Sequence, residues 1–342
     1  MNRLIRPVAR RVPLQQIRHV RAIAATGAPA PVAAVYAQVE RDFGMLAPPI
    51  ALHAADPAVL GAAWCLLRES LLATGAAARA VKEAVAAGVS RANQCPYCVT
   101  VHSATLDGLR PAADPLIPAA AAWAAGRADP AQLRLIRDLS PAARAELAGV
   151  ALTFHYLNRM VSVFLPPSPI PARAPAFVTK VAARLMGSMA RTVVQPGPAH
   201  EPLLSGTALP SDLAWAAPAP HVAEAVTHAV SVLALRAGPW LSDALLRLVQ
   251  SRLDVEADIA VGSRPWLDGA TAGLPAQERP VADLALLTAI AAYRMTDGIV
   301  ASARAALPTD DALIAVTAWA SFAAARRRTA ALLTPLTERH LA

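Results

Sequence analysis

Apolar residues recur at helical spacing along most of the chain and do not alternate as they would in strands. Val35, Val39 and Phe43 mark the first such stretch, which predicts a helix over residues 31–46. Asp56-Pro57 has the order of an N-cap and a first helical residue, so a second helix is expected to begin there. The same pattern predicts further helices over 76–87 (closed by Gly88), 131–138, 141–164, 176–190, 221–236, 238–253, 279–305 and 310–333.

Composition strengthens the helical interpretation. Hydrophobic residues make up 55% of the chain and alanine is abundant, and alanine is the best helix former. The sequence therefore predicts an all-α fold. The 30 prolines argue against long uninterrupted helices, and the run 166–171 is typical of an extended connector.

The 342 residues are enough for two helical domains. We expect a basic N-terminal extension over 1–30, a first helical domain over 31–195, a loop or linker over 196–220 and a second helical domain over 221–342. A faint internal similarity lays residues 293–303 over 94–104, and 319–326 over 152–159. The second copy lacks cysteine and histidine at the matching positions, which predicts a degenerate repeat with a packing role.

Charge and targeting signals narrow the class of protein. The formal net charge is +8, but most arginines are scattered, so no nucleic-acid partner is expected. The first residues are basic, with no acidic residue before Glu40, yet they lack the apolar core of a secretory signal. No stretch of 18 apolar residues predicts a membrane span. Three cysteines suit a reducing compartment, so a cytoplasmic location without a membrane partner is expected.

The segment Cys95-Pro96-Tyr97-Cys98 carries the clearest chemical signal. Pro96 favours the first position of a helix, which would make Cys95 the N-cap and lower its pKa through the helix dipole. Cys98 and His102 are four residues apart, so they share a helix face, and the histidine can take the thiol proton. Two cysteines three residues apart can also close into a disulfide. The pattern therefore predicts a redox-active pair.

Glu83 lies twelve residues before Cys95, at the edge of the apolar face of the preceding helix. A carboxylate there could turn toward the thiols and form a proton relay with His102. A single glutamate on a helix is more often a solvated surface residue, so this expectation depends on the fold.

Other interpretations of the cysteines are weaker. Cys65, Cys95, Cys98 and His102 would supply a Cys₃His zinc set, but they are expected in continuous helices, and Cys65 lies among apolar residues. No metal is therefore expected. A thioredoxin-like site would need a β-α-β pattern that the sequence does not show. His53 and His155 have no evident partner and are expected to be structural or exposed.

The spacing Glu83, eleven residues, Cys95-Pro96-Tyr97-Cys98, three residues, His102 resembles the core motif of the AhpD-like alkylhydroperoxidases within the carboxymuconolactone decarboxylase superfamily. The similarity extends over about residues 35–190, with 154–161 resembling a downstream family helix. It implies a helical bundle that assembles into homo-oligomers. It also implies a relay of Glu83, Cys95, Cys98 and His102, with Tyr97 lining the site.

By that resemblance the chain would reduce peroxides or a partner peroxiredoxin, taking electrons from a lipoyl- or thioredoxin-type dithiol donor. The disulfide of Cys95 and Cys98 would be the redox centre, and no separate cofactor is expected. We expect Cys98, next to His102, to attack the peroxide and Cys95 to resolve the sulfenic acid, although the helix N-terminus favours the opposite assignment. The rival interpretations are a non-catalytic redox sensor or interaction protein and a lactone decarboxylase-like enzyme of the same superfamily.

Overall fold

The structure is a computed structural model that describes residues 14–169, 176–197, 208–255 and 263–337. Within these ranges the regular structure is helical, and a single bridge between Ala73 and Val194 is the one strand-like pairing. The all-α prediction is confirmed. Residues 1–13 of the expected basic extension and 198–207 of the expected linker lie outside the described residues.

The main helices, in chain order, are α2 (Ala30–Asp42), α3 (Pro48–Ala51), α4 (Pro57–Leu67), α5 (Arg79–Ala92), α6 (Pro96–Leu109), α7 (Leu116–Ala124), α8 (Pro130–Arg137), α9 (Pro141–Phe164), α10 (Ala176–Met189), α11 (Pro220–Ala237), α12 (Asp243–Val255), α13 (Arg264–Thr271), α14 (Arg279–Ala291), α15 (Asp297–Ala303) and α16 (Asp310–Thr337). A π-helical turn, η1 (Arg68–Leu72), continues α4, and short 3₁₀ turns include η4 (Ala292–Arg294) after α14.

Helix starts follow the local sequence closely. The Asp56 carboxylate accepts hydrogen bonds from the N–H groups of Ala58 and Val59, as an N-cap should. Prolines lie in the first turn of most helices, including α2, α4, α6, α8, α9, α11, α13 and α14. Proline is tolerated there because its missing N–H would have no partner in the helix. These prolines therefore begin helices and do not interrupt them.

Several predicted boundaries are wrong. Helix α5 runs through Gly88, which was expected to end it. Gly88 is buried, and a Cβ there would collide with the Ala121 carbonyl, so the glycine serves the close approach of α5 and α7. Helix α7 lies in a segment that was expected to be irregular, and the expected helix over 279–305 is broken by η4 into α14 and α15.

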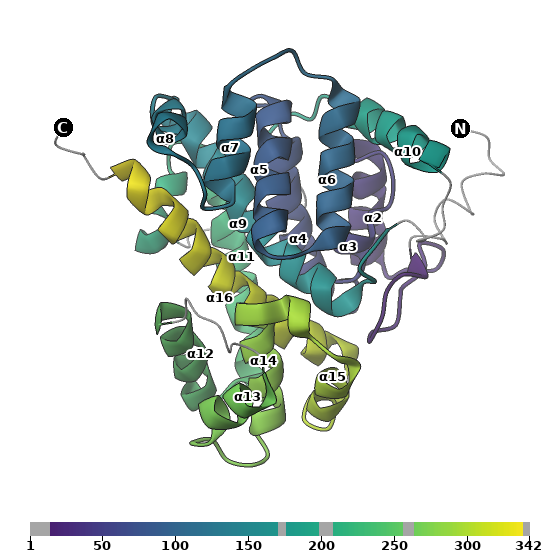
Figure 1. Cartoon of the computed structure of the whole chain (residues 1–342). Helices are drawn as coiled ribbons and strands as arrows, with labels where there is room; N and C mark the ends of the chain where they lie inside the picture. The colour runs from purple at the N-terminus through teal and green to yellow at the C-terminus, as the bar shows by residue number, and fades with distance from the viewer. Residues whose placement is uncertain (1–13, 170–175, 198–207, 256–262, 338–342) are drawn as a thin grey trace.

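Helix α9 is the centre of the molecule. Nearly all of its residues are buried, because α5 packs on one side of it and α16 and α14 on the other. Figure 1 shows α5, α6 and α7 side by side, with α10 next to α6 and α16 crossing the molecule diagonally. The hydrophobic core is continuous from α2 to α16. The first helices therefore hold the predicted site against a helix that the second half also supports.

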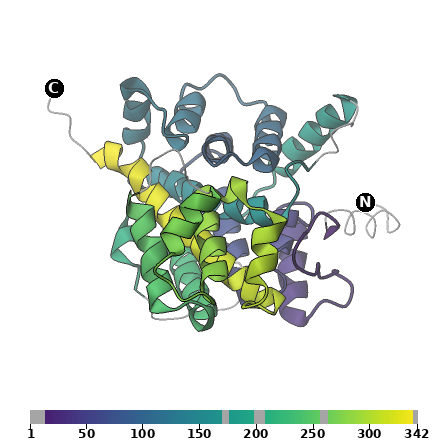
Figure 2. The same ribbon diagram turned by 60° about the horizontal axis from the view of Figure 1, so that its bottom comes forward.

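The second half contributes two kinds of helix. Helices α12 to α15 gather at one end of the molecule, below α16 in Figure 1 and toward the viewer in Figure 2. Helix α11 instead packs against α4 of the first half, and α16 lies along α9. In the expected repeat, α9 and α16 are the two matched long helices. The domain boundaries and the repeat itself stay predictions, although helices from both sides of residue 220 share one core.

No helix within the described residues is both long and apolar enough to cross a membrane.

Candidate active site

The two cysteines sit where a loop turns into α6. Helix α6 begins at Pro96, and Cys95 is its N-cap, as the sequence predicted. Gln94, with φ of 52°, lets the chain turn out of α5, and the Cys95 N–H donates to the Ser90 carbonyl at 3.0 Å. Cys95 and Cys98 are both buried and both free thiols.

The environments of the two thiols push their pKa values apart. Interaction with the Cys98 thiol, together with the backbone N–H groups at the start of α6 and the Ser162 hydroxyl, lowers the pKa of Cys95 against the effect of burial. Burial raises the pKa of Cys98 well above its ordinary value, and the neighbouring Cys95 raises it further, although the Asn158 amide works in the other direction. Of the two thiols, Cys95 therefore loses its proton more readily than Cys98.

Glu83 and His102 meet in the core. The ring Nδ1 of His102 donates to Glu83 Oε2 at 2.7 Å, and Arg79 donates to Oε1 from one turn earlier on α5. Glu83 is 1% exposed, so it is not the solvated side chain that a helical glutamate usually is. The structure thus places the two side chains together, as the proton-relay hypothesis expected, while their catalytic roles stay a prediction.

The Glu83 carboxylate is held in its charged form. Burial raises the pKa of Glu83, but the charges and hydrogen bonds of Arg79 and His102 outweigh burial and leave the pKa below its ordinary value. The His102 ring is also fixed by an edge-on contact with Phe154, with the ring centroids 4.4 Å apart. Since Nδ1 is bound to Glu83, Nε2 remains for chemistry in the space beside the ring.

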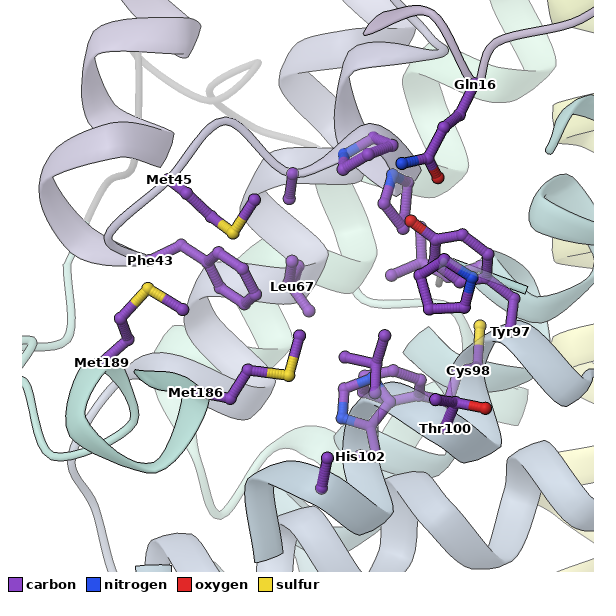
Figure 3. Close-up of a pocket in the computed structure, with 18 of the residues that line it drawn as sticks. Gln16, Phe43, Met45, Leu67, Tyr97, Cys98, Thr100, His102, Met186 and Met189 are labelled. Carbon is purple, nitrogen blue, oxygen red and sulfur yellow. The ribbon is translucent and has the colours of Figure 1, made fainter. Parts of the chain in front are cut away.

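That space is an apolar cavity of about 300 Å³. Figure 3 shows Phe43, Met186 and Met189 on the side opposite Tyr97 and Cys98, with His102 below. The cavity is lined by the N-terminal segment, the loop between α2 and α3, and helices α3, α4, α6, α9 and α10. Its lining includes Gln16, Phe43, Met45, Pro48, Leu67, Tyr97, Cys98, His102, Phe154, Leu157, Leu185, Met186 and Met189. Here it is called the apolar cavity.

Helix α10 closes one side of the apolar cavity. It packs on α6, and Gly187 approaches Gly108 so closely that any Cβ at position 187 would collide with the α6 backbone. This close approach brings Met186 and Met189 over the site. Methionine is flexible and polarizable, so these two residues can adapt to apolar molecules of different shape.

Cys95 is reached from a second cavity of about 390 Å³. Its lining includes Arg18, Gln94, Cys95, Pro96, Tyr97, Ser162, Pro166, Tyr293 and Met295. It is called the Cys95 cavity here. Tyr97 lines both cavities, which places it between them. The two sulfur atoms are therefore approached from different sides, Cys98 with His102 from the apolar cavity and Cys95 from the other.

The remaining candidate residues have structural surroundings. No group of three histidine, cysteine or acidic side chains that could hold a metal occurs in the part of the chain that the structure describes. Cys65 is buried in α4. His53 is buried and accepts a hydrogen bond from the Tyr156 hydroxyl at 2.8 Å, and His155 is buried beside Asn93. Neither histidine is exposed, and both have partners that the sequence did not reveal.

The structure adds three residues to the site. Arg79 has a sequence signal, because it lies four residues before Glu83 and so on the same helix face. Asn158 and Ser162, which act on Cys98 and Cys95, lie on α9, more than 50 residues further along the chain. Nothing in their local sequence points to the thiols. Only the packing of α9 beneath α5 and α6 brings them there.

Comparison with known proteins agrees with this geometry. The model of the carboxymuconolactone decarboxylase family matches residues 58–137, the range that contains Glu83, both site cysteines and His102. An alkyl hydroperoxide reductase of Mycobacterium tuberculosis is 36% identical over 330 residues, which cover 91% of this chain and 93% of the relative. No solved structure matches the chain. The match to the reductase includes the second half, which the family model does not reach. The chain therefore belongs to the carboxymuconolactone decarboxylase superfamily, among its AhpD-like members.

Proposed function

We propose that the protein is an AhpD-type peroxidase that reduces organic hydroperoxides with an apolar body, using the Cys95/Cys98 dithiol and a Glu83/His102 proton relay. The observation that carries the proposal is the apolar cavity that both Cys98 and His102 line, with Glu83 bound behind the histidine. The relative's name supports peroxide as the substrate class. Apolar walls with a few converging polar groups are typical of small-molecule sites.

The oxidative half-reaction begins at Cys98. His102 Nε2 takes the thiol proton, and the thiolate attacks the terminal oxygen of the hydroperoxide, breaking the O–O bond. The sulfur becomes a sulfenic acid, and the alkoxide leaves as the alcohol with the proton from His102. Glu83 stabilises the histidinium through the 2.7 Å hydrogen bond.

Cys95 then resolves the sulfenic acid. Its lowered pKa increases the fraction of thiolate, the form that attacks sulfur. Attack on Cys98 forms the disulfide and releases the sulfenic oxygen as water, with one proton supplied through His102. In this scheme the raised pKa of Cys98 is offset by His102, and the lowered pKa of Cys95 serves the second step.

The reductive half-reaction uses the other side of the dithiol. A donor thiolate enters the Cys95 cavity and attacks Cys95, and Cys98 leaves with a proton from His102. The donor's second thiol releases Cys95 and closes the donor's own disulfide. A lipoyl- or thioredoxin-type dithiol fits this stoichiometry.

The homo-oligomer implied by the family resemblance and the cytoplasmic location stay predictions. Measurement of the molar mass in solution tests the first, and cell fractionation tests the second.

The test is dithiol-dependent consumption of cumene hydroperoxide, followed beside trapping of the sulfenic acid with dimedone and mass spectrometry. Wild type should turn over repeatedly, and Cys95→Ser and Cys98→Ser should not. Cys95→Ser should still accept one equivalent of peroxide and carry the dimedone adduct on Cys98, because only the resolving thiol is missing.

The controls separate the rival functions. Cys65→Ser removes a cysteine of α4 that does not line either cavity and should leave turnover unchanged. An adduct on Cys95 in Cys98→Ser, with none on Cys98 in Cys95→Ser, would reverse the order of attack. Disulfide formation without repeated turnover would reject the peroxidase in favour of a redox sensor.

A further inference from the structure

A third cavity adjoins the dithiol on the side away from the apolar cavity. It measures about 160 Å³ and lies between α9, the end of α5, α14 with η4, and α16. Its polar lining consists of Asn93, His155, Asn158, Arg159, Ser162, Tyr293 and Arg328. It is called the arginine cavity here. It has room for a few water molecules or one small organic group.

The positive charge in this cavity has no carboxylate partner among the described residues. Arg159 is 5% exposed, yet within the described residues its guanidinium donates to neutral groups, the carbonyls of Ala289 and His155 and the amide oxygen of Asn93. Arg328 on α16 is exposed to solvent but also lines this cavity, without an ion pair in the described part of the chain. Buried guanidinium groups are normally paired, because an uncompensated buried charge is costly.

The hydrogen bonding of His155 is also incomplete. It is 4% exposed, and its Nδ1 donates to the Asn93 amide oxygen at 3.1 Å. Its Nε2 is buried and has no hydrogen-bond partner. A buried polar atom without a partner is uncommon and indicates a water or ligand that completes the site. The arginine cavity therefore holds two cations and an orphan ring nitrogen, and its lining contains no acidic residue.

The electrostatics of the cavity agree with this interpretation. Burial lowers the pKa of Arg159 to about 9, and the charge of Arg328 lowers it further. Burial also lowers the pKa of His155 well below its ordinary value, and Arg159 and Arg328 add to that effect. One bound anion would stabilise the buried charge of Arg159, offset the repulsion between Arg159 and Arg328, and favour the protonated form of His155. Tyr293 is the other titratable side chain that lines the cavity.

The arginine cavity is also connected to the dithiol. Ser162 and Tyr293 line both this cavity and the Cys95 cavity. Asn158 and Ser162, which line it, are the side chains that interact with Cys98 and Cys95. The arginine cavity therefore adjoins the Cys95 cavity, and Ser162 and Tyr293 lie at their common boundary.

We propose that the arginine cavity is a carboxylate-binding site, formed by Arg159, Arg328 and His155, which receives a carboxylate that is either free or carried by the thiol that reduces Cys95. The carboxylate accepts hydrogen bonds from the guanidinium groups, and His155 takes up a proton and donates from Nε2. The site itself does not depend on the peroxidase reaction. Its use by a reductant rests on the proposed function.

Binding of a free carboxylate is tested first. Acetate should raise the melting temperature in a saturable way, and acetamide, its uncharged counterpart, should not. Arg328→Met should weaken acetate binding about tenfold, in line with the loss of one charge-assisted hydrogen bond. Arg327→Met is the matched control, because Arg327 precedes it on the same exposed stretch of α16 but does not line the cavity.

Binding should also strengthen as the pH falls from 8 to 6. Bound acetate raises the pKa of His155 from its lowered value, so binding takes up a proton. His155→Gln keeps a polar group but cannot titrate, and should lose this pH dependence. Equal effects of acetate and acetamide on wild type, or no loss of acetate binding in Arg328→Met, would overturn the site.

The second arm asks whether the carboxylate belongs to the reductant. Dihydrolipoate and dihydrolipoamide are dithiols that differ in one carboxylate. Dihydrolipoate should reduce the oxidised protein about tenfold faster, acetate should compete with it, and Arg328→Met should abolish the preference. Equal rates, with acetate binding intact, would assign the site to a free carboxylate. Since these measurements follow binding and disulfide reduction, they remain informative even if peroxide turnover fails.

Discussion

The two sides of the dithiol differ in almost every physical respect. On the Cys98 side, apolar walls surround one histidine whose ring nitrogen is hydrogen-bonded to a buried carboxylate. On the Cys95 side, the two connected cavities carry arginines and an unpaired histidine nitrogen, with no acidic lining residue. One helix turn separates these environments. In the proposed reaction, one sulfur of the dithiol would therefore meet an apolar oxidant and the other a charged reductant.

Glu83→Gln should have the largest effect, a loss of peroxidase activity on the Cys98 side. The amide keeps the shape of the side chain but cannot stabilise a histidinium, so kcat/KM for cumene hydroperoxide should fall by about 10²-fold or more. Steady-state assays across pH 6 to 9 measure this loss. Glu224→Gln, which removes an exposed carboxylate of α11, should leave the rate unchanged. A change in rate of less than threefold in Glu83→Gln would remove the carboxylate from the relay.

The same substitution should change the pH dependence of stability. The folded pKa of Glu83 lies below its ordinary value, so the carboxylate stabilises the fold above the unfolded pKa and loses this effect as pH falls through the folded pKa. At pH 7 the loss should be about 3 kcal/mol, the low end for breaking a buried pair, because Arg79 is partly exposed. Urea unfolding at pH 7 and pH 3.5 measures it. A stability difference from wild type that grows on acidification would contradict this sign.

Met186→Ala tests whether the walls of the apolar cavity select the peroxide. Losing this side chain removes apolar contact area from a bound hydroperoxide, and kcat/KM for cumene hydroperoxide should fall about tenfold. The rate with hydrogen peroxide, which has no apolar body, should change little. Met295→Ala is the matched control, since that methionine lines the Cys95 cavity. Equal losses with both peroxides would mean that the apolar walls do not select the substrate.

Ser162→Ala gives the smallest expected effect, on the Cys95 side. Its hydroxyl helps to lower the pKa of Cys95, so its removal should slow alkylation of Cys95 by iodoacetamide at pH 7 by a factor of about three to ten. Peptide mass spectrometry reads the two cysteines separately. Ser103→Ala on α6 should have no effect, because that serine lines neither cavity. Unchanged alkylation in Ser162→Ala would leave the helix N-terminus as the main source of the low pKa.

Much of the local structure followed from sequence alone. The helix starts at Pro57 and Pro96, the Asp56 cap and the position of Cys95 at the start of α6 depend on neighbouring residues only, and they were predicted correctly. The prediction that the helix ends at Gly88 was wrong, because this glycine does not serve as a helix C-cap. It allows α5 to approach α7, and the sequence of one helix does not reveal which helix packs against it.

The candidate site, too, could be predicted from the sequence only in part. The sequence determined its reactive groups, since two thiols and a histidine share one face of α6 through helical spacing alone. It also placed Glu83 on the preceding helix, but its contact with His102 required α5 and α6 to pack side by side. The second half then supplies the surroundings of Cys95, through Tyr293, Met295 and Arg328. The sequence alone thus determined which reactive groups share a helix face. The different environments of the two thiols were decided by tertiary packing, because burial and charge depend on distances between helices that are far apart in the chain.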